Sequence, residues 1–280
     1  MRANAPKSRA AAITLSRVLS CVASTLVASA SIASAGPPDA DAELAARRLI
    51  AAYPEHLAAV EGATLVWRDG TRTTYDDGRG TKSFEEWLAA PDVEDMLLQP
   101  YPAGSAATPP PAGHDPGRAR NAEFFRRIYG DCGKGGVERD LVDVVWLPRK
   151  FGKPVKVTRI NGVAERLAAV SRELDALPDR FNRYLKPPAG TFVCRDIAGT
   201  TQRSAHGYGI AIDIALSQSD YWRWSKPGPG GAPTYRNRIP LEIVEVFERH
   251  GFIWGGRWHH YDTMHFEYRP ELLAPAAPVR

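Results

Sequence analysis

The chain has 280 residues, of which 44% are hydrophobic and 24% are charged, an ordinary globular composition. This composition excludes a disordered, a collagen-like and a multi-span membrane protein. The net charge of +4 comes from residues 1–35, which carry four basic side chains and no acidic one. Because the remaining 32 Lys and Arg balance 32 Asp and Glu, the charge does not favour a nucleic-acid partner, and we expect none.

Residues 1–35 are typical of a secretory signal peptide. They begin with basic residues, continue with an apolar stretch from Val18 to Ile32 and end on Ala33-Ser34-Ala35, a cleavage site of the A-x-A type. The pattern predicts an exported protein, periplasmic or secreted, with no transmembrane span after signal removal. Lipid anchoring at Cys21 is the alternative.

Two cysteines, Cys132 and Cys194, remain after such a cleavage. In an oxidising compartment an even pair readily forms a disulfide, here closing a loop of about 60 residues. Two unrelated buried thiols are the alternative. A zinc site built on these cysteines is not expected, since neither has a second Cys or His at ligand spacing.

The first part of the chain is predicted to form a small α+β extension and a linker. A loose apolar stripe predicts a helix over residues 39–60, and Asp69-Gly70 is typical of a hairpin turn. Residues 101–118 contain five prolines, so we expect an extended loop. The predicted parts are the signal peptide (1–35), the extension with its Pro-rich linker (36–117), a main domain (118–273) and a C-terminal tail (274–280).

The main domain is predicted to mix helices and strands. The expected elements are a strand at 141–147, a helix from Val163 to Leu174 that ends before Pro178, a helix from Pro240 to Gly251, and strands at 209–215 and 265–268. Few strands alternate with single helices in a βαβ rhythm. The sequence therefore favours an α+β fold with a small, mainly antiparallel sheet flanked by helices.

Two short clusters in the C-terminal part carry candidate chemistry. Strand alternation places Asp213 on the face opposite three isoleucines, and two glycines allow a turn that folds His206 toward it. In the second cluster, His265 and Glu267 share one strand face, and Asp262 lies just upstream. Two imidazoles and one carboxylate are the protein ligands of a catalytic zinc ion, and a further carboxylate can take a proton from water.

Together the two clusters resemble a known peptidase family. The pattern S-x-H-x-x-G-x-A-x-D at 204–213, followed by D-x-x-H-F-E at 262–267, is similar to the VanY-type zinc D-Ala-D-Ala carboxypeptidases and L-Ala-D-Glu endopeptidases. Their fold is shared with lysostaphin-type peptidases and the hedgehog signalling domain. The resemblance covers roughly residues 118–273. It implies a hedgehog/D-Ala-D-Ala peptidase-like fold and a peptidase acting on peptidoglycan stem peptides.

The resemblance also implies metal and proton-transfer roles. Three residues would bind one zinc ion per chain: His206, Asp213 and His265. Asp262 would be the general base. Because His260 and His265 have ligand spacing as well, a different ligand set stays open, and His259 or His260 could instead support the ligands from outside. Glu267 would orient a ligand or form a plain ion pair.

The substrate-binding residues are predicted less directly. The family holds the substrate or the developing oxyanion with an arginine upstream of the first ligand, and we expect Arg195, with Arg203 as the rival. Ser204 is expected to donate a hydrogen bond to the substrate, with a turn cap as its alternative role. Trp222 and Trp224, which precede a Pro- and Gly-rich loop, are expected to cover the core rather than to line a cleft.

The predicted function is therefore that of an exported zinc metallopeptidase, most simply a D-Ala-D-Ala carboxypeptidase. An endopeptidase that cuts inside the stem peptide is the first alternative. A non-catalytic, zinc-containing cell-wall-binding module is an alternative of another class. Asp262 argues against the module, because a binding module needs no carboxylate at the base position. The oligomeric state stays open.

Overall fold

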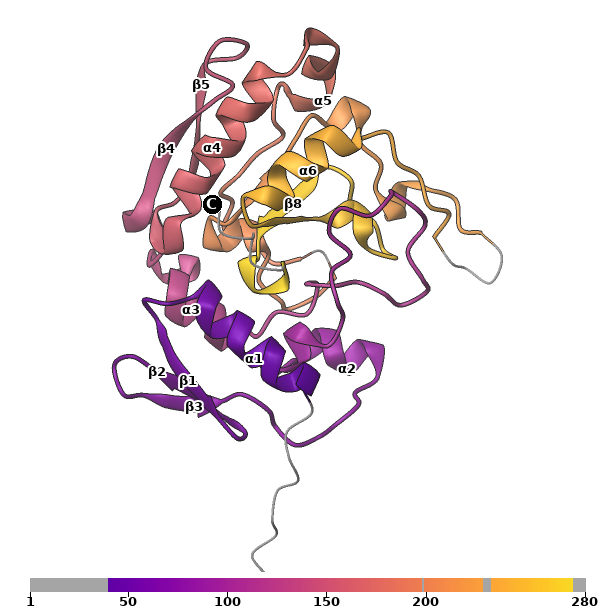
Figure 1. Ribbon diagram of the computed structural model, residues 1–280. Helices are drawn as coiled ribbons and strands as arrows, with labels where there is room; N and C mark the ends of the chain where they lie inside the picture. The colour runs from indigo at the N-terminus through magenta and orange to yellow at the C-terminus, as the bar shows by residue number, and fades with distance from the viewer. Residues whose placement is uncertain (1–39, 198, 229–232, 274–280) are drawn as a thin grey trace, which may run out of the picture. The chain divides into compact units, whose positions relative to one another are not determined.

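The computed structural model describes residues 40–197, 199–228 and 233–273. The predicted signal peptide, Cys21 and the predicted tail 274–280 lie outside the described residues. The described α-helices are α1 (Ala40–Ala52), α2 (Phe84–Ala89), α3 (Ala122–Tyr129), α4 (Val163–Ala176), α5 (Asn182–Leu185) and α6 (Leu241–Arg249) (Figure 1). The described strands are β1 (Leu57–Glu61), β2 (Thr64–Trp67), β3 (Arg72–Thr74), β4 (Leu141–Trp146), β5 (Lys153–Thr158), β6 (Ala211–Asp213), β7 (Phe252–Trp254) and β8 (His265–Tyr268).

Helix α1 and a three-stranded antiparallel sheet in the order β1-β2-β3 form the first part of the chain. The predicted hairpin through Asp69-Gly70 joins β2 to β3. The helix predicted over residues 39–60 ends at Ala52, so that prediction extended too far. Pro54 explains the early end, since the residue before a proline is disfavoured in helical geometry. The chain turns there, and the fully buried Leu57 begins β1.

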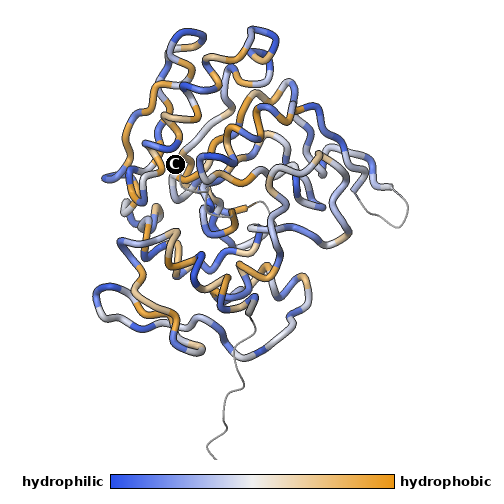
Figure 2. Tube along the Cα trace, in the orientation of Figure 1, coloured by the Kyte–Doolittle hydropathy of each residue, from blue (hydrophilic) through white to orange (hydrophobic). Residues whose placement is uncertain are grey.

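The rest of the chain builds its core from four packed layers. The β4–β5 hairpin packs on α4, α4 packs on α6, and α6 packs against the antiparallel sheet β6-β8-β7 (Figure 1). The apolar repeat predicted for α4 is fully buried at Leu167, Val170 and Leu174. Figure 2 shows hydrophobic and hydrophilic positions alternating along this helix. Phe247 of α6 stacks on Phe266 of β8 with ring centroids 3.8 Å apart. The predicted α+β class with small antiparallel sheets is confirmed.

The Pro-rich segment 101–118 has no regular structure, as predicted, but buried polar contacts anchor it. The hydroxyl of Tyr101 donates to Glu248 of α6 at 2.7 Å. The Arg257 guanidinium bonds the same carboxylate at 2.7 Å and donates to the Ser105 carbonyl at 3.0 Å. These bonds fix the loop on the side of the molecule that carries α6 and β7.

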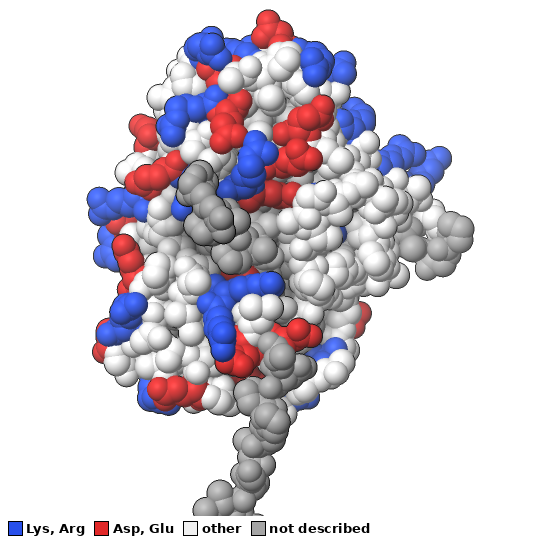
Figure 3. Space-filling model, viewed as in Figure 1, with Lys and Arg blue, Asp and Glu red and all other residues white. Residues whose placement is uncertain are grey.

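Helix length and surface charge are the two features of the described residues that bear on membrane contact. None of the helices in the described part of the chain is long and apolar enough to cross a membrane. On the face seen in Figure 3, Lys and Arg side chains lie interspersed with Asp and Glu. This face therefore presents mixed charge rather than a field of one sign.

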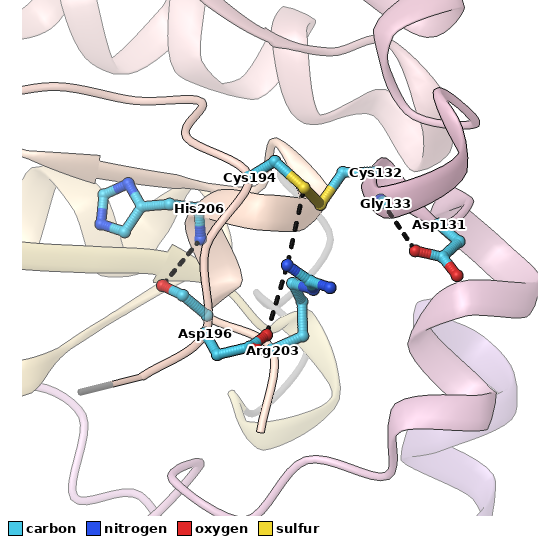
Figure 4. Close-up of a disulfide and its surroundings, with 8 residues drawn as sticks. Asp131, Cys132, Gly133, Cys194, Asp196, Arg203 and His206 are labelled. Atoms are coloured by element: carbon cyan, nitrogen blue, oxygen red, sulfur yellow. Dashed lines mark hydrogen bonds and ion pairs between the residues drawn. A yellow bond between two sulfur atoms is a disulfide. The ribbon is translucent and has the colours of Figure 1, made fainter. Parts of the chain in front are cut away.

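A disulfide joins Cys132 to Cys194, as predicted, with Cα atoms 5.7 Å apart and a sequence separation of 62 (Figure 4). Because a crosslink over a loop of this length restricts the unfolded chain, Cys132→Ser/Cys194→Ser should lower the free energy of unfolding by about 4 kcal/mol. Denaturant unfolding monitored by circular dichroism measures this loss. Reduction of the unaltered protein should give the same loss, and an unchanged unfolding midpoint would contradict the prediction.

Candidate metal centre and its pocket

The three predicted ligands converge at one end of the sheet β6-β8-β7. Asp213 closes β6 and His265 opens β8, and the antiparallel register places them directly opposite each other. His206 comes from the short 3₁₀ helix Ala205–Tyr208, which Ser204 caps and Gly209 ends. Gly209 has φ +70°, and a Cβ there would lie 3.0 Å from the Thr158 amide nitrogen. The glycine therefore permits the turn that brings His206 over Asp213.

The three donor atoms form a nearly regular triangle. His206 Nε2 lies 3.2 Å from Asp213 Oδ1 and 3.2 Å from His265 Nδ1. His265 Nδ1 lies 3.0 Å from the same Asp213 oxygen. Ligand atoms on a tetrahedral ion bound at zinc distances are about 3.3 Å apart. The spacing and chemistry of this donor set therefore fit a zinc-sized cation.

The outward-facing ring nitrogens also fit metal binding. His206 Nδ1 is hydrogen-bonded to the Thr191 carbonyl oxygen, and His265 Nε2 lies 2.9 Å from Glu267 Oε2. Because both oxygens are acceptors, these two nitrogens carry the hydrogens. When both rings are neutral, the opposite nitrogens direct their lone pairs at one another and at Asp213. Three acceptor atoms that face one point repel one another, and a bound cation would stabilise them. A hydrogen-bonded oxygen on the far side of each imidazole is also usual for a metal-binding histidine.

The charges around this triangle shift two pKa values in opposite directions. Burial lowers the pKa of His265, but hydrogen bonds to Asp213 and Glu267 outweigh it and raise that pKa to about 9. Burial raises the pKa of Asp213, yet the two imidazoles hold it well below its usual range. The carboxylate thus stays ionised near neutral pH, and a metal must displace a proton from His265.

Asp262 lies beside the triangle and is the best candidate for a base. It lines a pocket of about 280 Å³ together with His206, Asp213 and His265. Its buried Oδ1 atom has no hydrogen-bond partner among the described residues. Burial raises the pKa of Asp262 to about 6, against the opposing charge of His265. A buried carboxylate with a raised pKa at the wall of a pocket is suited to proton transfer.

The two candidate arginines lie in different surroundings. Arg195 lines the pocket, because its carbonyl accepts a hydrogen bond from the Ser204 amide and so holds it beside the cap of the His206 helix. Arg203 instead pairs with Asp196 at 3.2 Å and contacts the Cys194 sulfur at 3.5 Å (Figure 4). Ser204 also lines the pocket, while its hydroxyl accepts a bond from the His206 amide at 3.4 Å.

Further residues line the pocket, among them two arginines and two aromatic residues that the motifs did not indicate. Arg118 and Arg120 enter it from the end of the Pro-rich segment. Tyr221 and Trp224 form another wall, and 62% of the Trp224 surface is exposed. The expectation that Trp224 covers the core is therefore wrong, because this indole stands at the mouth of a polar pocket. The sequence did contain a signal for this wall, because the aromatic residues at 221–224 precede a Pro- and Gly-rich loop, and such loops often line binding sites.

His260 and His259 lie outside the ligand triangle. His260 Nδ1 bonds Asp115 Oδ2 at 2.8 Å, and its ring stacks on Phe84 with centroids 5.3 Å apart. His259 donates its amide to the His114 carbonyl. The alternative ligand pair His260 and His265 is therefore not brought together, since a different partner holds each ring.

Comparison with known proteins finds similarity to a peptidase family over the residues of this site. Residues 198–268 match a family model described as D-alanyl-D-alanine carboxypeptidase. The predicted resemblance to this peptidase family is confirmed. Over 72 residues the chain is 38% identical to the peptidoglycan L-alanyl-D-glutamate endopeptidase CwlK of Bacillus subtilis (strain 168). That stretch is 24% of this chain and 40% of the relative, so the chain spans less than half of the relative's length. No solved structure matches the chain.

Proposed function

We propose that the protein is an exported zinc metallopeptidase that hydrolyses peptide bonds of peptidoglycan stem peptides and removes their terminal D-Ala. The observation that carries the proposal is the triangle of His206, Asp213 and His265 beside the unpartnered oxygen of Asp262 in one pocket. The family match supports the substrate class. A hedgehog/D-Ala-D-Ala peptidase-like arrangement of the domain is part of the proposal.

In the proposed reaction, different side chains bind the metal ion, transfer the proton and hold the substrate. A zinc ion held by His206, Asp213 and His265 would polarise the scissile carbonyl and make water more acidic. The Asp262 carboxylate accepts a proton from the attacking water and returns it to the leaving nitrogen. The Arg195 guanidinium holds the substrate carboxylate or the developing oxyanion.

Two alternatives rest on particular observations. The similarity to CwlK favours an endopeptidase that cuts inside the stem peptide. A non-catalytic cell-wall-binding module would need the metal ligands but not the unpartnered Asp262, so the pocket favours an enzyme. The guanidinium of Arg195 suits a free terminal carboxylate, and for this reason we favour the carboxypeptidase.

Mass spectrometry of defined muropeptides after incubation with the purified protein, with and without a chelator, tests the proposal. Chelator-sensitive loss of one terminal D-Ala is the expected result. Fragments cut within the stem would replace the carboxypeptidase by the endopeptidase. Amidating the terminal carboxylate should abolish cleavage by a carboxypeptidase and leave an endopeptidase unaffected. No cleavage by a metal-loaded preparation would favour the binding module.

Metal binding should depend on pH because of His265. Its pKa is raised to about 9, so below that pH the ring is protonated and a metal ion must displace this proton. The apparent zinc affinity should therefore fall by about tenfold for each unit that the pH is lowered from 8 to 6. Competition with a chromophoric chelator measures this slope. An affinity that does not change with pH would contradict the assignment of His265 as a ligand.

A further inference from the structure

The ligand candidate His265 is connected to a chain of buried charges that extends away from the pocket. Glu267, on the same face of β8, accepts the His265 Nε2 hydrogen at 2.9 Å. Two arginines hold this carboxylate: Arg120 and Arg269. None of the surface of Glu267 and Arg269 is exposed, and only 7% of Arg120. The imidazole is therefore backed by a buried ion-pair network, in which only Arg120 reaches the pocket.

Each oxygen of Glu267 has a defined set of partners. Oε2 takes the His265 hydrogen and a bond from Arg120 Nη2. Oε1 takes a bond from Arg120 Nε at 3.2 Å and one from Arg269 Nη1 at 3.1 Å. Arg120 thus binds the carboxylate of Glu267 in a bidentate manner, which fixes the plane of the carboxylate as well as its position. A rotated carboxylate would lose the bond to His265.

The network is anchored outside the β8 strand at both ends. Arg269 bonds Glu271 at 2.5 Å and the Gly117 carbonyl at 2.7 Å. Glu271 in turn accepts the hydroxyl hydrogen of Tyr53, which follows α1, at 2.9 Å. Arg120 lies at the end of the Pro-rich segment and 147 positions before Glu267. Residues upstream of the two motifs thus complete the surroundings of a metal ligand.

We propose that Arg120, supported by Arg269, is a positioning residue that orients the metal ligand His265 through Glu267. The inference rests on the proposed metal site. Two buried carboxylates, Glu267 and Glu271, face two buried guanidinium groups. Removal of Arg120 leaves Glu267 with one guanidinium partner, Arg269 at Oε1, and with none at the oxygen that bonds the imidazole. The part of the chain before α3 then contributes to the metal centre, not only to packing.

Arg120→Met tests this inference, with metal affinity as the readout. Loss of an outer partner of a metal-bound histidine typically weakens metal affinity by about 10–100-fold, and we expect a loss in this range. Competition with a chromophoric chelator gives the Zn²⁺ affinity, and the visible absorption of the Co²⁺-loaded protein reports the ligand geometry. Arg120→Lys, which keeps the charge but not the fork, should restore part of the affinity.

Arg257→Met is the matched control. Arg257 is 4% exposed and pairs with the buried Glu248 at 2.7 Å, but it belongs to a separate network. This variant should lose stability and keep its metal affinity and Co²⁺ spectrum. If Arg120→Met does not fold, Arg120→Lys is compared with Arg257→Lys in the same assays.

The outcomes separate three roles for Arg120. Weakened metal binding in folded Arg120→Met, with Arg257→Met unaffected, supports the inference. Unchanged affinity together with a raised KM would overturn it and assign Arg120, which also lines the pocket, to substrate binding. An unaltered protein that binds neither Zn²⁺ nor Co²⁺ would overturn the proposed metal site itself.

Discussion

Asp262→Asn is expected to lower kcat by about 10²–10⁴-fold, the range that a general base contributes, while zinc stays bound. The asparagine has nearly the same size, so the pocket keeps its shape. It cannot accept a proton at the position of the Oδ1 atom, which has no partner among the described residues. Turnover of a defined muropeptide and metal content by elemental mass spectrometry, measured on one preparation, check both parts of this prediction.

Asp143→Asn is the control for this substitution. Asp143 is exposed on β4 and pairs with Lys156 at 2.9 Å, outside the pocket. The Asp143→Asn variant should retain full turnover, since an exposed ion pair of this kind contributes little to stability. An Asp262→Asn protein with wild-type kcat would remove the carboxylate from the mechanism. Loss of the metal as well would indicate that Asp262 binds it.

The geometry of the metal triangle was largely predictable from sequence because two of its members obey strand alternation. Side chains two apart share a strand face, which put His265 beside Glu267 and Asp213 opposite the buried isoleucines. The alternation did not give the pairing of Asp213 with His265, which depends on the register between β6 and β8. The family resemblance supplied that connection, because it joins both motifs in one site.

The arginines that enter the pocket from upstream could not be predicted from local pattern. Arg120 meets Glu267 across 147 positions of sequence, and no periodicity relates the two. Arg118 and Arg120 follow a Pro-rich segment, which indicates only an irregular loop. The fold brings this loop to the pocket through tertiary contacts, such as the bond from Tyr101 to Glu248, whose partners are far apart in sequence.

Strand β5 was missed for a different reason. It contains Pro154, which usually argues against a strand. The proline is tolerated because it is the second residue of a strand at the edge of a two-stranded hairpin, opposite Val145. Val155 and Val157 do alternate with exposed lysines, but the run is short. Sequence patterns thus predicted β4 and the buried helix α4, but not the second strand of this hairpin.

His206→Ala is expected to weaken zinc binding more than the roughly 100-fold upper range for an outer partner, because it removes a direct donor. Two donors, Asp213 and His265, remain 3.0 Å apart, and they leave the cation with fewer ligands than a zinc site normally has. Activity should disappear together with the metal. Competition titration with a chelator, followed by turnover at saturating zinc, separates loss of binding from loss of chemistry.

His260→Ala is the control for the His206→Ala prediction. His260 has ligand spacing to His265 in sequence, but its ring bonds Asp115 and stacks on Phe84. It should therefore keep zinc at wild-type affinity. If His260→Ala lost the metal and His206→Ala kept it, the ligand assignment would be wrong, and the ligands would have to come from the segment that contains His260 and His265. Loss of the metal in His206→Ala alone would show that residues of both motifs bind the same ion, as the proposed peptidase mechanism requires.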